Sequence, residues 1–163
     1  MEPLRIYRIR DGYIRYLYSI DNRVQYNKGS RRPYVGIVLE VEGHQYFVPM
    51  ESPKPNHDKL KANIHIMKID GGKYGQLGFN NMIPAKDEHL IRFDINEEPN
   101  EAYRELLLNQ LMYCRAHKSE IYEHARKTYK AVEDGKSFFT RICCDFKKLE
   151  REYTKYHYKT YTR

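Results

Sequence analysis

The spacing of apolar residues changes at Pro99, and this change constrains the fold more than any other feature of the chain. Before Pro99, short segments such as LRIYRI (residues 4–9) alternate apolar and polar side chains with a period of two, which is typical of strands. After Pro99, apolar side chains recur at helical spacing. Because strands come first and helices later, we predict an α+β fold: a twisted antiparallel sheet flanked by helices, with a mainly helical C-terminal half.

Turn residues and caps divide the two halves into elements. We predict strands at residues 4–9, 34–42, 44–50, 64–69, 82–84 and 89–95, the second and third forming a hairpin that turns at Glu42-Gly43. We predict helices at residues 12–21, 99–118, 119–135 and 137–159, with Asp11 and Ser119 as N-caps and Gly135 as a stop. Residues 22–33 and 75–81 are predicted to be irregular.

Length and hydropathy limit the class of protein. A chain of 163 residues fits one domain over residues 1–163. No apolar run approaches the roughly 18 residues of a membrane span. The opening MEPLRIYRIRDG carries charges within every short apolar group, unlike a secretion signal. We therefore predict a cytoplasmic protein.

The cysteines and the strand histidines show no spacing typical of a metal site. The cysteines, which we interpret as packing residues, are Cys114, Cys143 and Cys144. The histidines, which we interpret as sheet-face residues, are His44, His65 and His89. We predict neither a metal nor a cofactor.

Positive charge is concentrated at the two ends of the chain. The formal net charge is +7; residues 1–34 contain eight Arg or Lys against three Asp or Glu, and residues 147–163 contain six against two. The same segments hold ten of the sixteen tyrosines. Basic side chains attract phosphates and tyrosine rings stack on unpaired bases, so we predict that the two ends meet and bind RNA. The alternative is that these tyrosines are half-buried core residues with solvated hydroxyls. The predicted RNA-binding residues are Lys28, Arg31, Arg32, Lys155, Tyr156, Tyr158 and Lys159.

The stretch YFVPMESPKPNHDKL places polar groups with proton or charge chemistry directly after a predicted strand. They include Glu51, Ser52, Lys54 and His57. Pro53 fixes φ between Ser52 and Lys54, and a turn there would present a hydroxyl and an ammonium to one phosphate. The alternative is that this segment is only a solvated turn.

The segment GIVLEVEGHQYFVPMESPK, with the following His57, resembles the ToxN/AbiQ family of type III toxin–antitoxin toxins, and within it a CptN-like subgroup. Further segments with the same resemblance are LRIYRIRDGYIRYLYSID, Tyr26, NNMIP, EAYRELLLNQLMYCRAHK and CDFKKLEREY, so it covers most of the chain. It implies a sheet core similar to the Kid/MazF toxins and a metal-independent endoribonuclease. It also implies an RNA antitoxin, a pseudoknot repeat that the toxin cuts from its precursor and then holds in a closed cyclic protein–RNA assembly. Free toxin would cleave cellular mRNA and cause growth arrest or abortive phage infection.

The SPK segment, Ser52-Pro53-Lys54, and its surroundings contain residues that fit the three requirements of metal-free RNA cleavage. The 2′-OH must lose a proton, the phosphorane must be stabilised, and the 5′-oxygen must gain a proton. Lys54 offers a positive charge and a proton, Ser52 a hydroxyl for a phosphate oxygen, and His57 a proton shuttle. Tyr26 can donate a hydrogen bond or stack on a base, and Arg32, where the family carries a basic residue, suits a phosphate.

Glu51 departs from the family pattern, which more often has Thr before Ser-Pro-Lys. A carboxylate there could hold Lys54 or act as a base. Two other functions stay open on the sequence alone. In a non-catalytic RNA-binding protein the basic ends would act and the SPK segment would be a turn. A DNA-binding regulator is disfavoured because the sequence shows no helix-turn-helix with a clear recognition helix.

Overall fold

Seven strands form one sheet in the part of the chain that the structure describes, and every strand pairing is antiparallel. The computed structural model describes residues 4–25, 29, 32–41, 43–55 and 63–157. The strands are β1 (Arg5–Ile9), β2 (Tyr34–Val41), β3 (His44–Glu51), β4 (Ile66–Lys68), β5 (Gln76–Gly78), β6 (Ile83–Pro84) and β7 (Leu90–Arg92). Their order is β4-β5-β3-β2-β1-β7, with β6 paired to β3. The predicted antiparallel sheet is confirmed.

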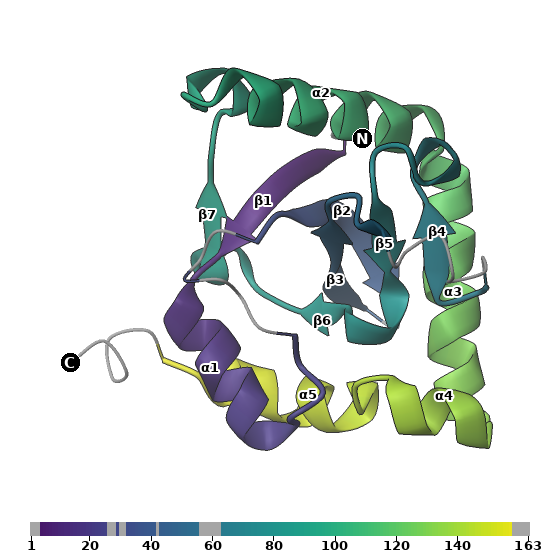
Figure 1. The fold of residues 1–163 in the computed structure, drawn as a ribbon. Helices are drawn as coiled ribbons and strands as arrows, with labels where there is room; N and C mark the ends of the chain where they lie inside the picture. Colours follow the sequence, from purple (N-terminus) through teal and green to yellow (C-terminus); the bar gives the residue numbers. More distant parts are fainter. Residues whose placement is uncertain (1–3, 26–28, 30–31, 42, 56–62, 158–163) are drawn as a thin grey trace.

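Helices frame this sheet (Figure 1). The α-helices are α1 (Asp11–Ile20), α2 (Glu101–Ala116), α3 (Lys118–Glu133), α4 (Ser137–Ile142) and α5 (Phe146–Glu152). Short 3-10 helices are η2 (Asp70–Gly72), η3 (Phe79–Asn81), η4 (Asp87–His89), η5 (Ile95–Glu97) and η6 (Tyr153–Lys155). Figure 1 shows α2 along one side of the sheet, α3 along the next, and α1, α4 and α5 along the side opposite α2. The mainly helical C-terminal half is therefore as predicted.

The β2–β3 hairpin is the centre of the sheet. Gly43 has φ +82 at its turn, a left-handed conformation that a residue without Cβ adopts at little cost. Residues 46–50 of β3 are all buried, because β3 has sheet neighbours on both edges and helices outside it. A continuous apolar run of this kind is typical of a strand covered on both faces.

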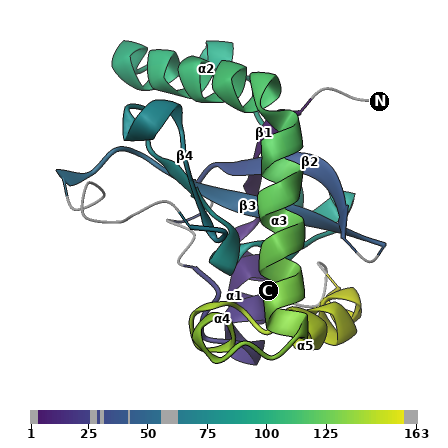
Figure 2. The ribbon, with the colours of Figure 1, turned by 90° about the vertical axis from the view of Figure 1, so that its right-hand side faces the viewer.

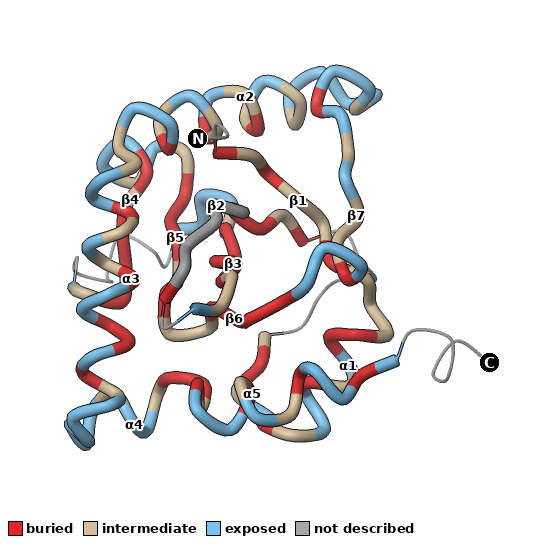
Figure 3. The backbone as a smooth tube through the Cα atoms, turned by 180° about the vertical axis from the view of Figure 1, so that it is seen from behind, coloured by how far each residue is buried: buried red, intermediate tan, exposed pale blue. Residues whose placement is uncertain are grey.

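Aromatic contacts attach α3 and α5 to the sheet. The Tyr46 ring of β3 lies edge-on to Tyr129 of α3 and Phe146 of α5, with ring centroids 6.1 and 5.8 Å apart. The Tyr46 and Tyr129 hydroxyls both donate to the Glu150 carboxylate, at 2.6 and 2.9 Å. In Figure 2, α3 crosses in front of the sheet. In Figure 3, which is coloured by burial, buried residues recur along α3. These contacts give α5 a fixed position relative to the β3 strand.

Three helix predictions were wrong in detail. The predicted helix at 137–159 is two helices, α4 and α5, because Asp145 caps a new helix by accepting the Lys148 N–H and Cys143 is extended. Asp11 is not the cap of α1: Arg10 holds that position, and Asp11 forms an ion pair with Arg15 at 3.3 Å instead. Ser119 is likewise not a cap, since His117 precedes the first residue of α3.

One strand was missed in the connection predicted to be irregular. Residues 76–78 form β5, which pairs with both β3 and β4. A segment of three residues carries too little alternation for its period to be recognised. The predicted strand at 82–84 is confirmed as β6, although it spans only two residues.

The cysteines pack as predicted: Cys114, Cys143 and Cys144 are free and buried. Burial raises the pKa of the Cys114 and Cys143 thiols to about 12. The helices among the described residues are all too short or too polar to cross a bilayer.

Candidate active site

The SPK segment leaves the sheet at the end of β3. Glu51 is the last residue of the strand and is half-buried, whereas Ser52, Pro53 and Lys54 are exposed. A hydroxyl and an ammonium therefore stand in solvent directly after a strand held by neighbours on both sides. This is the arrangement that a phosphate-binding group on a rigid support requires.

Gly75 packs its backbone against the point where this segment begins. It has φ +97, and a Cβ built on it would lie 1.8 Å from the Glu51 carbonyl oxygen. A side chain there would have to displace the backbone of residues 51–52, so only glycine fits. Gly75, which precedes β5, thus allows the start of β5 to lie close to the last residue of β3.

The loop after α1 reaches the same point. The Gln25 side-chain amide donates to Glu51 Oε1 at 3.1 Å. Asp21 holds the first residues of this loop. Its side chain is 4% exposed and accepts from the Arg23 backbone N–H at 3.0 Å and from Arg23 Nε at 2.9 Å. The loop is thus fixed two residues before Gln25. Neither Gln25 nor Gly75 was predicted from the sequence, because each acts through a contact with a strand distant in the chain.

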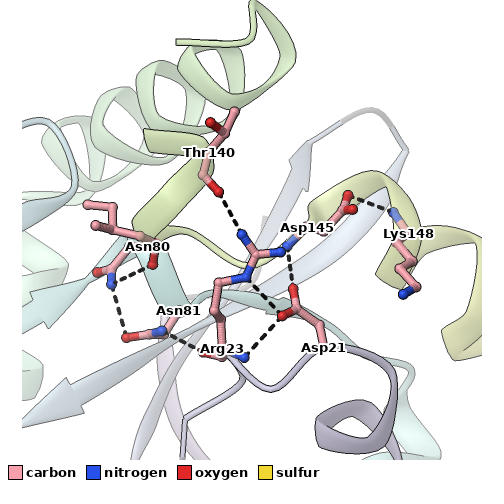
Figure 4. A network of polar contacts seen from close by, with 8 residues as sticks. Asp21, Arg23, Asn80, Asn81, Thr140, Asp145 and Lys148 are labelled. Carbon is pink, nitrogen blue, oxygen red and sulfur yellow. Dashed lines mark hydrogen bonds and ion pairs between the residues drawn. The ribbon is translucent and has the colours of Figure 1, made fainter. Parts of the chain in front are cut away.

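Asp21 and Arg23 also connect this loop to the helices (Figure 4). Asp21 Oδ2 accepts from the Asp145 N–H at 2.6 Å, and an Arg23 guanidinium nitrogen donates to the Thr140 carbonyl at 2.6 Å. Asn81 donates to the Arg23 carbonyl at 2.8 Å. Burial alone would raise the pKa of Asp21, but the hydrogen bonds from Arg23 and Asp145 outweigh it and the pKa is lowered. The carboxylate is therefore held in its charged form.

Arg32 lies just before β2, which flanks the end of β3 on the edge opposite β5. The Met50 N–H donates to the Pro33 carbonyl at 3.0 Å, next to the paired residues Tyr34 and Pro49. Arg32 itself is 6% exposed. Burial raises the pKa of Tyr34, and the nearby positive charge of Arg32 opposes this rise. A phosphate contact by Arg32 stays a prediction, and it would use only the small exposed part of the side chain.

Several predicted site residues lie outside the described residues. They are Tyr26, Lys28, Arg31, His57, Tyr158 and Lys159. Their predicted roles, including the proton shuttle of His57, stay predictions.

The two ends of the chain do meet, but through buried rings. The Tyr16 hydroxyl of α1 donates to the Glu152 carbonyl at 2.8 Å, and Tyr156 contacts the Tyr13 and Tyr16 rings. Tyr156 is 2% exposed, so the prediction that it stacks on an RNA base is wrong: its faces are already covered by protein. Lys155 forms an ion pair with Glu152 at 2.9 Å, but its side chain is exposed to solvent.

The three histidines are held by protein contacts. His44 begins β3 and its Nδ1 lies 2.8 Å from the Tyr153 hydroxyl. His65 is buried just before β4, and His89 is buried in η4 rather than on a strand, stacked 3.7 Å from the Tyr13 ring. Among the described residues no three His, Cys, Asp or Glu side chains converge as a ligand set. The absence of a metal requirement stays a prediction.

The chain is similar to known proteins over most of its length. The family model for toxin ToxN of type III toxin–antitoxin systems matches residues 5–154. Endoribonuclease ToxN of Bacillus thuringiensis subsp. kurstaki is 32% identical over 93% of this chain and 84% of its own length. Endoribonuclease AbiQ of Lactococcus lactis subsp. lactis is 29% identical over 96% of this chain and 91% of its own.

Solved structures are similar over nearly the whole fold. One, from work on selective toxin inhibition by a non-coding RNA pseudoknot in bacterial type III systems, has a TM-score of 0.81 and 30% identity, covering 95% of this chain and 98% of the other. The structure of AbiQ, a lactococcal anti-phage endoribonuclease, has a TM-score of 0.81 and 27% identity, with the same coverage of both chains.

Proposed function

Since this chain belongs to the ToxN family, the toxins of type III toxin–antitoxin systems, and is an endoribonuclease, we propose that the SPK segment at the end of β3 carries its RNA-cleaving chemistry. The observation that supports this most directly is the exposure of Ser52 and Lys54 at the end of a buried central strand. A simple solvated turn would not need Gly75 and Gln25 in contact with Glu51, the residue that precedes it.

The proposed reaction uses the substrate's own 2′-OH as nucleophile. Its oxygen attacks the adjacent phosphorus, its proton passes to a base, and the bond from phosphorus to the 5′-oxygen breaks as that oxygen takes up a proton. Lys54 stabilises the negative charge of the phosphorane and Ser52 donates a hydrogen bond to a phosphate oxygen. Tyr26, Glu51 and His57 are the candidates for the proton transfers.

Alanine substitution of the SPK residues tests the site. We expect Lys54→Ala and Ser52→Ala each to slow RNA cleavage by about 10²–10⁴-fold while the protein stays folded and binds RNA. Lys127→Ala, an exposed lysine on α3, is the matched control and should keep full activity. Full activity of a folded Lys54→Ala protein would refute the site.

The products and the metal requirement test the mechanism. We expect cleavage in excess EDTA, with a 2′,3′-cyclic phosphate on one fragment and a 5′-hydroxyl on the other. A 5′-phosphate end or a strict Mg²⁺ requirement would contradict attack by the 2′-OH.

The partner we propose is an RNA antitoxin, a pseudoknot repeat bound in a closed cyclic protein–RNA assembly in the cytoplasm. The support is the basic charge of both ends, which meet at α1 and α5, and the similarity to a toxin inhibited by an RNA pseudoknot. Lys155→Ala should weaken antitoxin binding and reduce its salt dependence, and Lys130→Ala on α3 should change neither. Release of the toxin would then lead to mRNA cleavage and to growth arrest or abortive phage infection.

A further inference from the structure

Three polar side chains lie next to one another across β4, β5 and β3, at the end of the sheet from which Ser52 emerges. Lys68 is paired with Gln76 in the β4–β5 register, and Gln76 is paired with Glu51 in the β5–β3 register. Directly paired residues of antiparallel strands point to the same face of a sheet. Lys68, Gln76 and Glu51 therefore form one row, and Figure 1 shows β4 and β5 beside β3 on this side of the sheet.

The middle residue of this row fixes the lysine. Lys68 Nζ donates to Gln76 Oε1 at 3.0 Å, and Gln76 is only 5% exposed. A buried side-chain amide with a fixed acceptor direction holds the ammonium in one place while the half-buried Lys68 still reaches solvent. An amide oxygen accepts a hydrogen bond from an ammonium without neutralising its charge.

We propose that Lys68 is a further RNA-binding residue, which holds a phosphate next to the scissile one, and that Gln76 is its positioning residue. This inference rests on the proposed function of Ser52 and Lys54. Two strand spacings, about 10 Å, separate the backbone of Lys68 from that of Glu51. The phosphate at Lys68 would then belong to a neighbouring nucleotide of the bound strand rather than to the one cleaved at Ser52. The row would therefore set the direction in which the RNA crosses the sheet.

Substrate length separates this role from a purely structural one. A dinucleotide has only the scissile phosphate, whereas an RNA of ten nucleotides also has its neighbours. For Lys68→Ala we expect unchanged cleavage of the dinucleotide and an approximately tenfold lower kcat/KM on the longer RNA, carried by KM. The salt slope of binding should flatten by about 0.7, the value for one phosphate contact to a single strand. Lys68→Arg should restore the slope.

Lys73→Ala is the matched control, because Lys73 is exposed in the same β4–β5 connection but lies over the Tyr74 ring. It should behave as the parent on both substrates. Gln76→Leu should lose activity on the longer RNA, and adding it to Lys68→Ala should cause no further loss. Equal losses on both substrates, or an unchanged salt slope, would overturn the proposal. Full activity of Lys54→Ala would instead refute the proposed function, so the two failures are distinguishable.

Discussion

The Gln25 amide donates to Glu51 Oε1 at 3.1 Å, and this contact joins the loop after α1 to the strand that ends in the SPK segment. The two residues are 26 positions apart, and no local pattern predicts the contact. Glu51 was predicted to hold Lys54 or to act as a base. The structure shows that the neutral Gln25 amide contacts the Glu51 carboxylate. The two predicted roles of Glu51 stay predictions.

Replacing this donor should therefore affect the reaction more than the fold. Gln25→Leu removes the hydrogen bond that orients Glu51, and we expect kcat to fall about tenfold while the free energy of unfolding falls by no more than about 1 kcal/mol. The measurement is single-turnover RNA cleavage alongside urea unfolding. Asn22→Ala, on the exposed part of the same loop, is the control and should retain the parent rate. An unchanged rate for Gln25→Leu would mean that the orientation of Glu51 does not matter.

Gly75 and Gly71 offer a matched pair of glycine substitutions in one connection. Both have positive φ, but a Cβ on Gly71 would meet nothing within 4 Å, whereas one on Gly75 would overlap the Glu51 carbonyl. Gly71→Ala should cost about 1–2 kcal/mol of unfolding free energy, the cost of the left-handed conformation alone, and keep activity. Gly75→Ala should lose considerably more stability and also cleavage activity. Similar stability of the two variants would show that the approach of β5 to β3 is not required.

Asp21 should matter for stability because three donors converge on its buried carboxylate. Asp21→Asn points an NH2 group or a neutral oxygen at those donors, and we expect the free energy of unfolding to fall by about 2–4 kcal/mol. Since the pKa of Asp21 is lowered in the folded protein, its contribution is present above the unfolded pKa and is lost as pH falls through the folded pKa. Asp11→Asn removes an exposed ion pair with Arg15 and should cost less than about 1 kcal/mol. Urea midpoints at neutral pH compare the two variants.

His89 should make the protein less stable in mild acid. Burial lowers the pKa of His89 to about 4; Lys86 and Arg10 lower it as well, and Glu88 opposes them. The unfolded chain, with an ordinary pKa near 6.5, binds the proton first. The unfolding free energy therefore falls between about pH 6.5 and 4, by on the order of 2–3 kcal/mol.

The matched variant for this prediction is His89→Asn. His89 Nδ1 accepts the Lys86 N–H at 3.1 Å, and the Asn oxygen can replace that acceptor without titrating. Urea unfolding of both proteins from pH 4 to 7 should show a steeper pH dependence for the parent. Equal slopes would assign the acid sensitivity to other groups, of which the buried His65, with its pKa lowered by burial, is the first to examine.

The amino-acid sequence by itself determined the division into a sheet and a helical half, the central hairpin and the exposed position of Ser52 and Lys54. Those features depend on the period of apolar residues, on Gly43 at a turn and on Pro53, all of which act within a few residues. Helix ends were less predictable, because the contact of Asp145 with Asp21 and the cap of α5 compete with helical propensity near residues 143–145.

The tertiary structure alone decided which residues surround the SPK segment and which tyrosines face solvent. Gln25, Gly75 and the row from Lys68 to Glu51 come together only when distant strands pair. Tyr156 lies in a polar, basic segment, yet its ring is buried and contacts the Tyr13 and Tyr16 rings of α1. An amphipathic ring with charged neighbours suits either a surface or a core, and only the helix packed against it fixes the outcome.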